Sequence, residues 1–183
     1  MTVTSQALAE RVPAGTYRVD PVHSSARFEV EHGAISPYRG GFGELTGTLD
    51  AGPDGLALSG AVDVTTVDVE EPDLRGHLLS PEFFDAERHP RISFVSRRLR
   101  VDGDALEFEG ELEMRGATNR IEARGTLRGP ASGADGSSRV ALEIETTVDR
   151  RDYGLDWQLE LPGGGIALGY DVKLTVVLEL VRD

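Results

Sequence analysis

The most regular stretch of the chain is Leu106-Glu107-Phe108-Glu109-Gly110-Glu111-Leu112-Glu113-Met114. Every second residue in it is apolar or glycine, and the residues between them are all glutamate. Because successive side chains of a strand point to opposite faces, this period of two predicts a strand with one buried face and one solvated face. A helix would spread the same glutamates around its whole axis. The stretch therefore predicts a half-buried strand that presents its glutamates to solvent.

The same alternation extends outward to residues 140–149 and 172–180, and more weakly to other segments. Weaker strands are expected at 17–31, 40–50, 56–68, 91–102 and 119–129, which makes about eight strands joined by Gly- and Asp-rich turns. Two stretches interrupt the pattern, at residues 70–90 and 151–169. The first is expected to contain a short helix from Asp73 to Leu79.

Strands with one apolar face must bury those faces together, either as a sandwich of two sheets or as one sheet closed into a barrel. Two features favour a barrel that keeps space inside. Glycines within the predicted strands leave volume unfilled where they face inward: Gly41, Gly43, Gly47, Gly60, Gly110 and Gly125. The two interruptions are apolar enough to cover an opening. The residues alone predict an all-β fold and leave the choice between sandwich and barrel open.

Length and charge narrow the function classes. The chain has 183 residues, a formal net charge of −13 and no cysteine, which suits one domain without disulfides or thiolate metal sites. An excess of acid disfavours nucleic acid and anionic membranes as partners. No apolar run reaches the roughly 18 residues of a membrane span, and the start of the chain does not resemble a signal peptide. We expect no stable membrane insertion, a cytoplasmic location, an arm at residues 1–15 with a short helix capped by Ser5, and one barrel domain at 16–183.

Residues that could carry chemistry do not form a recognisable constellation. His23, His32, His77 and His89 lack metal-ligand spacing, and no serine lies in a nucleophile elbow. Asp149-Arg150-Arg151-Asp152 is expected to be an ion-pair network that pins the second interruption. We therefore predict no catalytic residue, no metal and no cofactor. An apolar interior without reactive groups is typical of a container rather than a catalyst.

Several short motifs occur in a characteristic order. Tyr17-Arg18-Val19-Asp20-Pro21-Val22-His23-Ser24 opens the domain, and Gly40-Gly41-Phe42 follows. The most specific motif is Gly76-His77-Leu78-Leu79-Ser80-Pro81-Glu82-Phe83-Phe84-Asp85, followed by His89-Pro90 and Ile92-Ser93-Phe94. Leu112-Glu113-Met114-Arg115-Gly116-Ala117-Thr118 and Asp149-Arg150-Arg151-Asp152-Tyr153-Gly154 come later. In this order, over residues 16–182, the chain resembles the YceI-like family of polyisoprenoid-binding proteins.

The resemblance implies an extended lipocalin-like antiparallel β-barrel of about eight strands with one or two short helices. It also implies an apolar tunnel that holds a polyisoprenoid or an isoprenoid-quinone-like lipid. The chain departs from the family at Leu74-Arg75, where Arg-Asp is usual, and at Leu79, where a basic residue is common. Both changes make the segment more apolar.

We therefore predict non-enzymatic binding, sequestration or transport of a long-chain isoprenoid or similar lipid. The residues expected to face the tunnel are those on the apolar face of each strand, which would serve equally well as plain core: Phe28, Val30, Phe42, Val62, Val64, Phe94, Leu106, Phe108, Leu112, Met114, Leu142, Ile144, Val172, Leu174 and Val176. The residues expected to form the lid and mouth are Leu74, Leu78, Phe83, Phe84, Trp157 and Leu161. Two alternatives stay open: an enzyme that uses His23 or an Arg151–Asp152 pair on a lipophilic substrate, and a filled barrel that acts as an interaction module or homodimer.

Overall fold

A computed structural model describes residues 10–183, so the Ser5 cap lies outside the described residues. The described chain is mostly strand, as the alternating pattern predicts. The strands are β1 (Gly15–Val19), β2 (Ser25–His32), β3 (Ser36–Phe42), β4 (Leu45–Gly52), β5 (Gly55–Asp63), β6 (Val67–Asp68), β7 (Arg91–Asp102), β8 (Ala105–Met114), β9 (Ala117–Ser132), β10 (Ser138–Asp149) and β11 (Leu168–Arg182). The expected short helix is α2 (Pro72–Leu79), and two 3₁₀ turns are η1 (Val64–Thr66) and η2 (Arg150–Tyr153).

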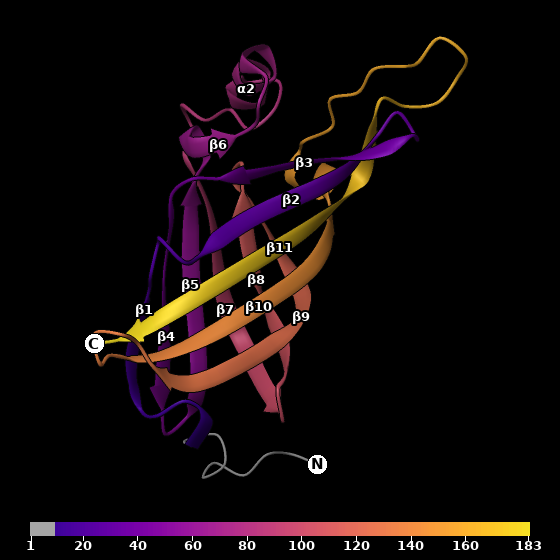
Figure 1. Cartoon of the computed structure of the whole chain (residues 1–183). Helices are drawn as coiled ribbons and strands as arrows, with labels where there is room; N and C mark the ends of the chain where they lie inside the picture. Colours follow the sequence, from indigo (N-terminus) through magenta and orange to yellow (C-terminus); the bar gives the residue numbers. More distant parts are fainter. Residues whose placement is uncertain (1–9) are drawn as a thin grey trace.

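Eight strands close into an antiparallel barrel in the order β1-β4-β5-β7-β8-β9-β10-β11, and β11 pairs back with β1. The closure is the pairing of Tyr17 with Arg182 and of Val19 with Leu180. The structure thus selects the closed barrel over the sandwich and confirms the predicted strand number for the closed ring. Figure 1 shows the barrel as an elongated body with α2 above one end.

The sheet continues beyond the closed ring through β2, β3 and β6. Residues 172–177 of β11 pair with β2, whereas its last residues pair with β1. The change of partner occurs at Glu179, whose amide donates to Ser24 Oγ at 3.0 Å and whose carbonyl accepts from the Asp20 amide at 2.8 Å. Arg139 binds the carboxylates of Asp20 at 3.0 Å and Glu179 at 2.6 Å. We call these contacts the junction. Above it, the additional strands β2 and β3 widen the wall.

Three predicted strands are interrupted in the structure. The expected strand 56–68 is divided between β5 and β6 by η1, because the Asp63 carboxylate accepts from the Thr65 amide at 2.8 Å and caps this turn. The expected strand 17–31 breaks between β1 and β2, because the Asp20 carboxylate accepts from the Val22 amide at 2.9 Å and closes a local Asx turn. The expected strand 40–50 is divided between β3 and β4 at Gly43 and Glu44, whose amides donate to the Thr66 carbonyl and hydroxyl. The first half of β3 was missed because its residues are mostly exposed and carry no apolar alternation.

The two faces of β8 match the prediction. Leu106, Phe108, Leu112 and Met114 are buried, whereas the glutamates lie on the outer face beside arginines of neighbouring strands. Arg97 of β7 binds Glu111 at 2.6 Å, and Arg120 of β9 binds Glu109. Exposed pairs of this kind contribute little to stability, so the inward leucine and phenylalanine side chains hold the strand in place.

The interior consists of two clusters stacked along the barrel. The lower cluster lies within the closed ring and contains eight of the nine largest fully buried side chains among the described residues: Val12, Tyr17, Leu49, Leu106, Leu127, Val140, Leu142 and Leu180. Val12 precedes β1 and is 2% exposed, and Arg11 beside it donates to the carbonyls of Gly103 at 3.0 Å and Leu127 at 2.9 Å. These contacts close the lower end of the barrel.

The upper end of the barrel carries the two interruptions of the strand pattern. In Figure 1, α2 with β6 and the long segment between η2 and β11 both rise above this end. Arg150 ties the second segment down, because its guanidinium donates to the carbonyls of Leu155, Leu168 and Gly169. Across residues 10–183, the structure contains no helix with the length and apolar character needed to cross a bilayer.

Candidate functional site

The upper half of the barrel encloses a cavity of about 570 Å³. This volume falls in the range of cavities that hold small-molecule ligands, about 300–1,000 Å³. Its wall is formed mainly by apolar side chains from the strands, from α2 and from the segment after η2. Such a surface offers many van der Waals contacts and few hydrogen bonds, so it suits an apolar chain better than a polar metabolite.

Two glycines leave part of the wall without side chains. Gly47 of β4 and Gly60 of β5 are register partners, and both line the cavity. A Cβ added at Gly47 would lie 2.7 Å from the Ser59 carbonyl oxygen, so the close approach of the strands requires glycine here. Both glycines line the cavity without a side chain, but a Cβ at either position would meet the backbone of the neighbouring strand.

Other inward glycines have the opposite effect, because aromatic rings cover them. A Cβ at Gly110 would lie 2.4 Å from the ring of Phe94, and a Cβ at Gly40 would lie 2.4 Å from the ring of Phe28. These glycines allow large rings to lie flat against the wall. An inward glycine therefore either leaves the cavity wall without a side chain or allows an aromatic ring to pack against the backbone. The sequence alone does not distinguish these two cases.

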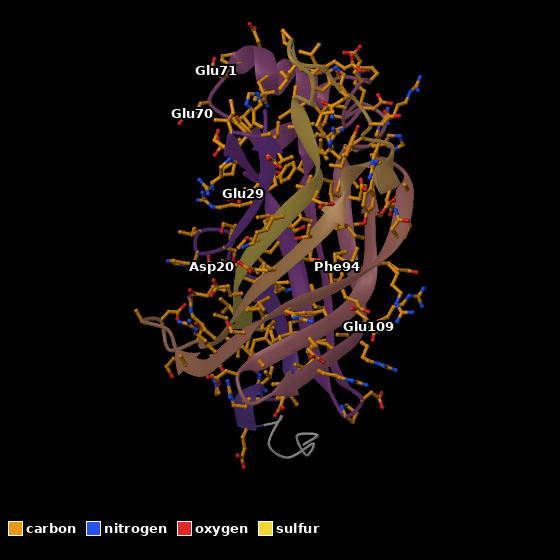
Figure 2. The ribbon with its side chains drawn as sticks, turned by 90° about the vertical axis from the view of Figure 1, so that its right-hand side faces the viewer. Asp20, Glu29, Glu70, Glu71, Phe94 and Glu109 are labelled. Atoms are coloured by element: carbon orange, nitrogen blue, oxygen red, sulfur yellow. The ribbon has the colours of Figure 1, made fainter. Side chains whose placement is uncertain are left out.

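The floor of the cavity is the set of residues that belong both to its wall and to the lower cluster. Its buried members are Leu58, Phe108, Ala123 and Leu178. Phe94 packs against both the upper and the lower cluster, and Figure 2 shows it between the two ends of the barrel. Below this level the leucine-rich lower cluster fills the barrel.

The mouth of the cavity is lined by Leu74, His77, Phe84, Trp157 and Leu159. The rings of His77 and Trp157 meet edge to face at 4.8 Å between centroids, which joins α2 to the segment after η2. Phe84 contacts Phe42 of β3 at 6.0 Å in a similar geometry. Leu159 lines the cavity and is 57% exposed, so the wall reaches the molecular surface at this residue.

Few polar side chains reach the upper part of the cavity. The Nε2 atom of His77 is buried and has no hydrogen-bond partner among the described residues, although the Glu82 carboxylate lies 3.5 Å away. Arg150 lines the cavity, is 2% exposed, and has its pKa lowered by burial. Since its guanidinium binds three carbonyls, Arg150 holds the backbone of the mouth in place.

Three carboxylates lie near Tyr38 at the upper end of the barrel. Tyr38 lines the cavity, and its pKa is raised first by burial and then by the charges of Glu70, Glu71 and Asp68. Figure 2 shows Glu70 and Glu71 at the end of the barrel that carries α2. A head group that rests here meets negative charge, which favours a neutral or cationic group over a phosphate.

The structure brings most of the predicted tunnel and mouth residues to the cavity wall. Those that line it are Phe28, Val30, Phe42, Val62, Leu74, Leu78, Phe83, Phe84, Phe94, Phe108, Leu112, Met114, Ile144, Trp157, Val172, Leu174 and Val176. Their contact with a ligand stays a prediction.

Four of the predicted residues do not line the cavity. Leu106 and Leu142 are each 1% exposed in the lower cluster, because the barrel is solid at their level. Val64 is 1% exposed in η1, where it packs in the upper cluster behind the wall. Leu161 lies in the turn closed by the pairing of Glu160 with Ile166 and does not reach the mouth.

Sequence reasoning missed several residues of the wall. Ile121 lies on the inward face of β9, and extending the alternation of that strand from Ala123 would have identified it. His77 and Arg150 are polar, and no pattern in the sequence indicated that they would border an apolar cavity. Their placement depends on how α2 and the segment after η2 fold back over the barrel.

The expected ion-pair network at residues 149–152 is only partly correct. Arg151 binds Asp149, with Nη2 to Oδ2 at 2.5 Å, and lowers the pKa of that carboxyl to about 2. Arg150, not an ion pair, pins the segment after η2. The Arg151–Asp152 pair of the enzyme alternative is not formed in the described structure.

The other residue of the enzyme alternative, His23, lies outside the cavity wall. Its Nδ1 atom is 2.9 Å from Asp20 Oδ2, and the hydrogen bond with Asp20 and nearby carboxylates raise its pKa. Asp20, His23 and Glu179 place ligand-type atoms within 4.8 Å of one another. Arg139 binds both carboxylates, however, so its positive charge already balances the negative charge that a metal ion would otherwise neutralise.

Comparison with known proteins agrees with this architecture. The YceI-like domain family matches residues 17–180. A UPF0312 protein of Pectobacterium atrosepticum is 26% identical over 186 residues, covering 99% of this chain and 94% of that protein. A UPF0312 protein of Staphylococcus epidermidis is 25% identical over 174 residues, covering 91% and 98% respectively.

Solved structures share the fold at low sequence identity. BcnA of Burkholderia cenocepacia superposes with a TM-score of 0.74 at 15% identity, covering 88% of this chain and 98% of that one. A polyisoprenoid binding domain from Saccharophagus degradans superposes with a TM-score of 0.72 at 14% identity, covering 91% of this chain and 98% of that one. The YceI protein of Campylobacter jejuni superposes with a TM-score of 0.69 at 21% identity, covering 84% of this chain and 90% of that one. Since the family match spans nearly the whole barrel, the resemblance seen in the sequence is confirmed, and the chain belongs to the YceI-like family.

Proposed function

We propose that this protein binds the tail of a polyisoprenoid, an isoprenoid quinone or a similar long-chain lipid, and sequesters or carries it without catalysing a reaction. The observation that carries the proposal is the apolar cavity in the upper half of the barrel, which has a solid floor and an aromatic mouth. Each CH₂ group removed from water contributes about 0.8 kcal/mol. A lipid tail would therefore bind tightly with few polar contacts.

Two further observations support a lipid. The neighbour from Saccharophagus degradans is described as a polyisoprenoid binding domain, and this chain belongs to the same structural group. The filled-barrel alternative applies only to the lower half of the barrel, where Leu106 and Leu142 are packed. We expect the predicted residues that line the cavity to contact the tail, with Trp157 and His77 closest to the head group.

The test is to identify what the protein retains. The protein is purified without detergent, extracted with organic solvent, and the extract is analysed by mass spectrometry. We expect a long-chain lipid in a fixed ratio to protein. A delipidated sample should then take up geranylgeraniol, with a change in the emission of Trp157, which is the only tryptophan of the chain. Empty extracts together with no uptake of geranylgeraniol would exclude the proposal.

A further inference from the structure

We propose that the floor of the cavity sets a maximum length for the lipid tail, and that Phe94 and Phe108 determine this length. The inference rests on the proposed function and adds a specificity to it. A tail enters at the mouth and can extend only as far as the floor. Carbon atoms beyond that length have to stay near the mouth, where they gain little from burial.

The position of Phe94 is fixed by the strand beside it. Its ring lies against Gly110, so closely that a Cβ there would be 2.4 Å from the ring. Gly110 stands between Phe108 and Leu112 on the inward face of β8. The Phe94 ring therefore occupies the inward position between these two side chains and cannot move toward β8.

Phe108 forms the adjoining part of the floor together with its partner on β9. Phe108 pairs with Ala123, both line the cavity, and they are 3% and 6% exposed. One member of the pair is large and the other is small. The depth of the cavity at this point therefore depends on a single ring, and the small partner leaves room to enlarge the floor by substitution.

Within residues 10–183, packed side chains fill the barrel below the floor. The next inward residues on β8 and β10 are Leu106 and Leu142, each 1% exposed. On β9 Gly125 pairs with Leu106, and the following inward residue, Leu127, is 0% exposed. These three leucines belong to the solid lower cluster, together with Tyr17 and Leu180. A tail that passed Phe108 would have to displace this packed layer, and packed interiors resist such insertion.

The depth of the cavity gives an approximate tail length. On β8 the lining residues extend from Phe108 to Met114, which corresponds to about 20 Å along the strand. Because the strands of such a barrel tilt by about 40° from its axis, the depth along the axis is roughly 15 Å. An extended hydrocarbon advances roughly 1.25 Å for each 1.5 Å carbon–carbon bond. The cavity therefore accommodates a tail of about a dozen bonds.

The experiment measures affinity along a series of straight-chain alcohols from octanol to octadecanol, using delipidated protein and the emission of Trp157. In the wild-type protein the affinity should rise about fourfold with each added CH₂ group. We expect the increase to stop near dodecanol. A continuous increase to octadecanol would overturn the inference and leave the proposed function intact, whereas no binding of any alcohol would contradict the proposed function.

Two substitutions move the floor in opposite directions. We call the chain length at which the affinity stops rising the break. Phe108→Ala should shift the break to longer alcohols by two or more carbons, because the removed ring extends the cavity. Ala123→Leu should shift the break to shorter alcohols, because it adds bulk to hollow space. If Phe108→Ala fails to fold, Ala123→Leu still tests the inference, since filling a cavity does not remove packing.

Leu106→Ala is the matched control. It removes a buried side chain two residues before Phe108 on the same face of β8, so it should lower stability, but the Phe108 ring still separates the new void from the cavity. The break in the alcohol series should therefore stay where it is in the wild-type protein. A folded Phe108→Ala or Ala123→Leu variant with an unmoved break would overturn the inference, as would a shift in Leu106→Ala equal to that of Phe108→Ala.

Discussion

Strands β8, β10 and β11 run with the same alternation through the upper and the lower half of the barrel, yet one half is hollow and the other is solid. Strand β11 crosses both halves. Its inward residues Leu174 and Val176 line the cavity and are only partly buried, whereas Leu180 is 0% exposed within the lower cluster. An inward position on a strand thus predicts burial from bulk water, but it does not predict whether the side chain faces a void or another side chain.

The difference has two causes. In the lower half the ring is closed by β1, and a ring of eight strands is just wide enough for side chains to fill it. In the upper half β11 pairs with β2 instead, and β3 follows, so the wall has a larger circumference. Gly47 and Gly60 then leave part of that wider wall without side chains.

The largest contrast is expected when the same charge enters each half. Leu142 is 1% exposed in the lower cluster, so Leu142→Arg places an unpaired cation in a packed interior, which costs several kcal/mol out of the roughly 5–15 kcal/mol that stabilise a domain. Leu112 lines the cavity, so the guanidinium of Leu112→Arg can extend along the wall toward the mouth. Circular dichroism should show loss of cooperative melting for Leu142→Arg and a folded barrel for Leu112→Arg.

Lipid retention separates the two variants in a second way. Folded Leu112→Arg protein should contain no extractable lipid, because the charge occupies the cavity. Loss of folding in both variants would show that the upper half is as tightly packed as the lower half, and the comparison would fail.

A smaller contrast is expected for removal of apolar bulk on one strand. Leu180→Ala leaves a void in the solid cluster and should lower the free energy of unfolding by about 3–5 kcal/mol. Leu174→Ala only enlarges an existing cavity. The free energy of unfolding should therefore fall by about 1–2 kcal/mol, close to the free energy of transferring the removed carbon atoms out of water. Urea unfolding of the two lipid-free variants measures both values, and equal losses would contradict the division of the barrel.

The fold could be predicted from the sequence because it depends on local alternation. The repeat at 106–114 gave the correct face for each side chain of β8, and Asp73–Leu79 was recognised as a short helix. The break at Asp20 could also have been read from Asp-Pro, a pair typical of turns. These features need no knowledge of distant contacts.

The cavity could be predicted only in part, because its limits depend on contacts between distant segments. Leu106 and Phe108 look equivalent in the sequence, but the first lies below the floor and the second forms it. The meeting of His77 with Trp157 joins residues 80 positions apart. Periodicity specifies neither the level at which β11 changes partner nor the segment that covers the opening.

The mouth belongs only to the hollow half, and its contacts should affect ligand exchange more than stability. His77→Ala removes the ring that packs on Trp157 at 4.8 Å, so the bound lipid should leave several times faster and Trp157 emission should shift to longer wavelength. The free energy of unfolding should change by no more than about 1–2 kcal/mol, since His77 is partly exposed. Stopped-flow transfer of lipid to vesicles measures the rate.

A control on the same helix is available. Arg75 of α2 donates to the Thr65 carbonyl at 2.6 Å and does not line the cavity. Arg75→Ala should leave the release rate of the lipid near the wild-type value. If both variants release lipid at the wild-type rate, the contact between His77 and Trp157 does not control exit.

The smallest effect is expected at the junction, where the solid and hollow halves meet on the outer surface. A hydrogen bond with Asp20 and nearby carboxylates raise the pKa of His23 above its usual value. The folded state therefore binds this proton more tightly than the unfolded state, so the stabilisation is fully present below about pH 6.5 and is lost as the pH rises through the raised pKa. His23→Gln should lower the melting temperature by at most about 2–4 °C near pH 5 and have no effect near pH 9.

Asp20 supplies the complementary half of the test. Its pKa is lowered to about 2, first by the hydrogen bond with His23 and also by Arg139, so its stabilisation is present above about pH 3.8 and is lost as the pH falls toward 2. In Asp20→Asn protein, His23→Gln should cause little further change near pH 5, because the two groups act as a pair. Equal effects of His23→Gln with and without Asp20 would show that the imidazole contributes independently of the junction. In that case the change of partner on β11 would depend on Arg139 and on the backbone contacts of Glu179, not on a titrating group.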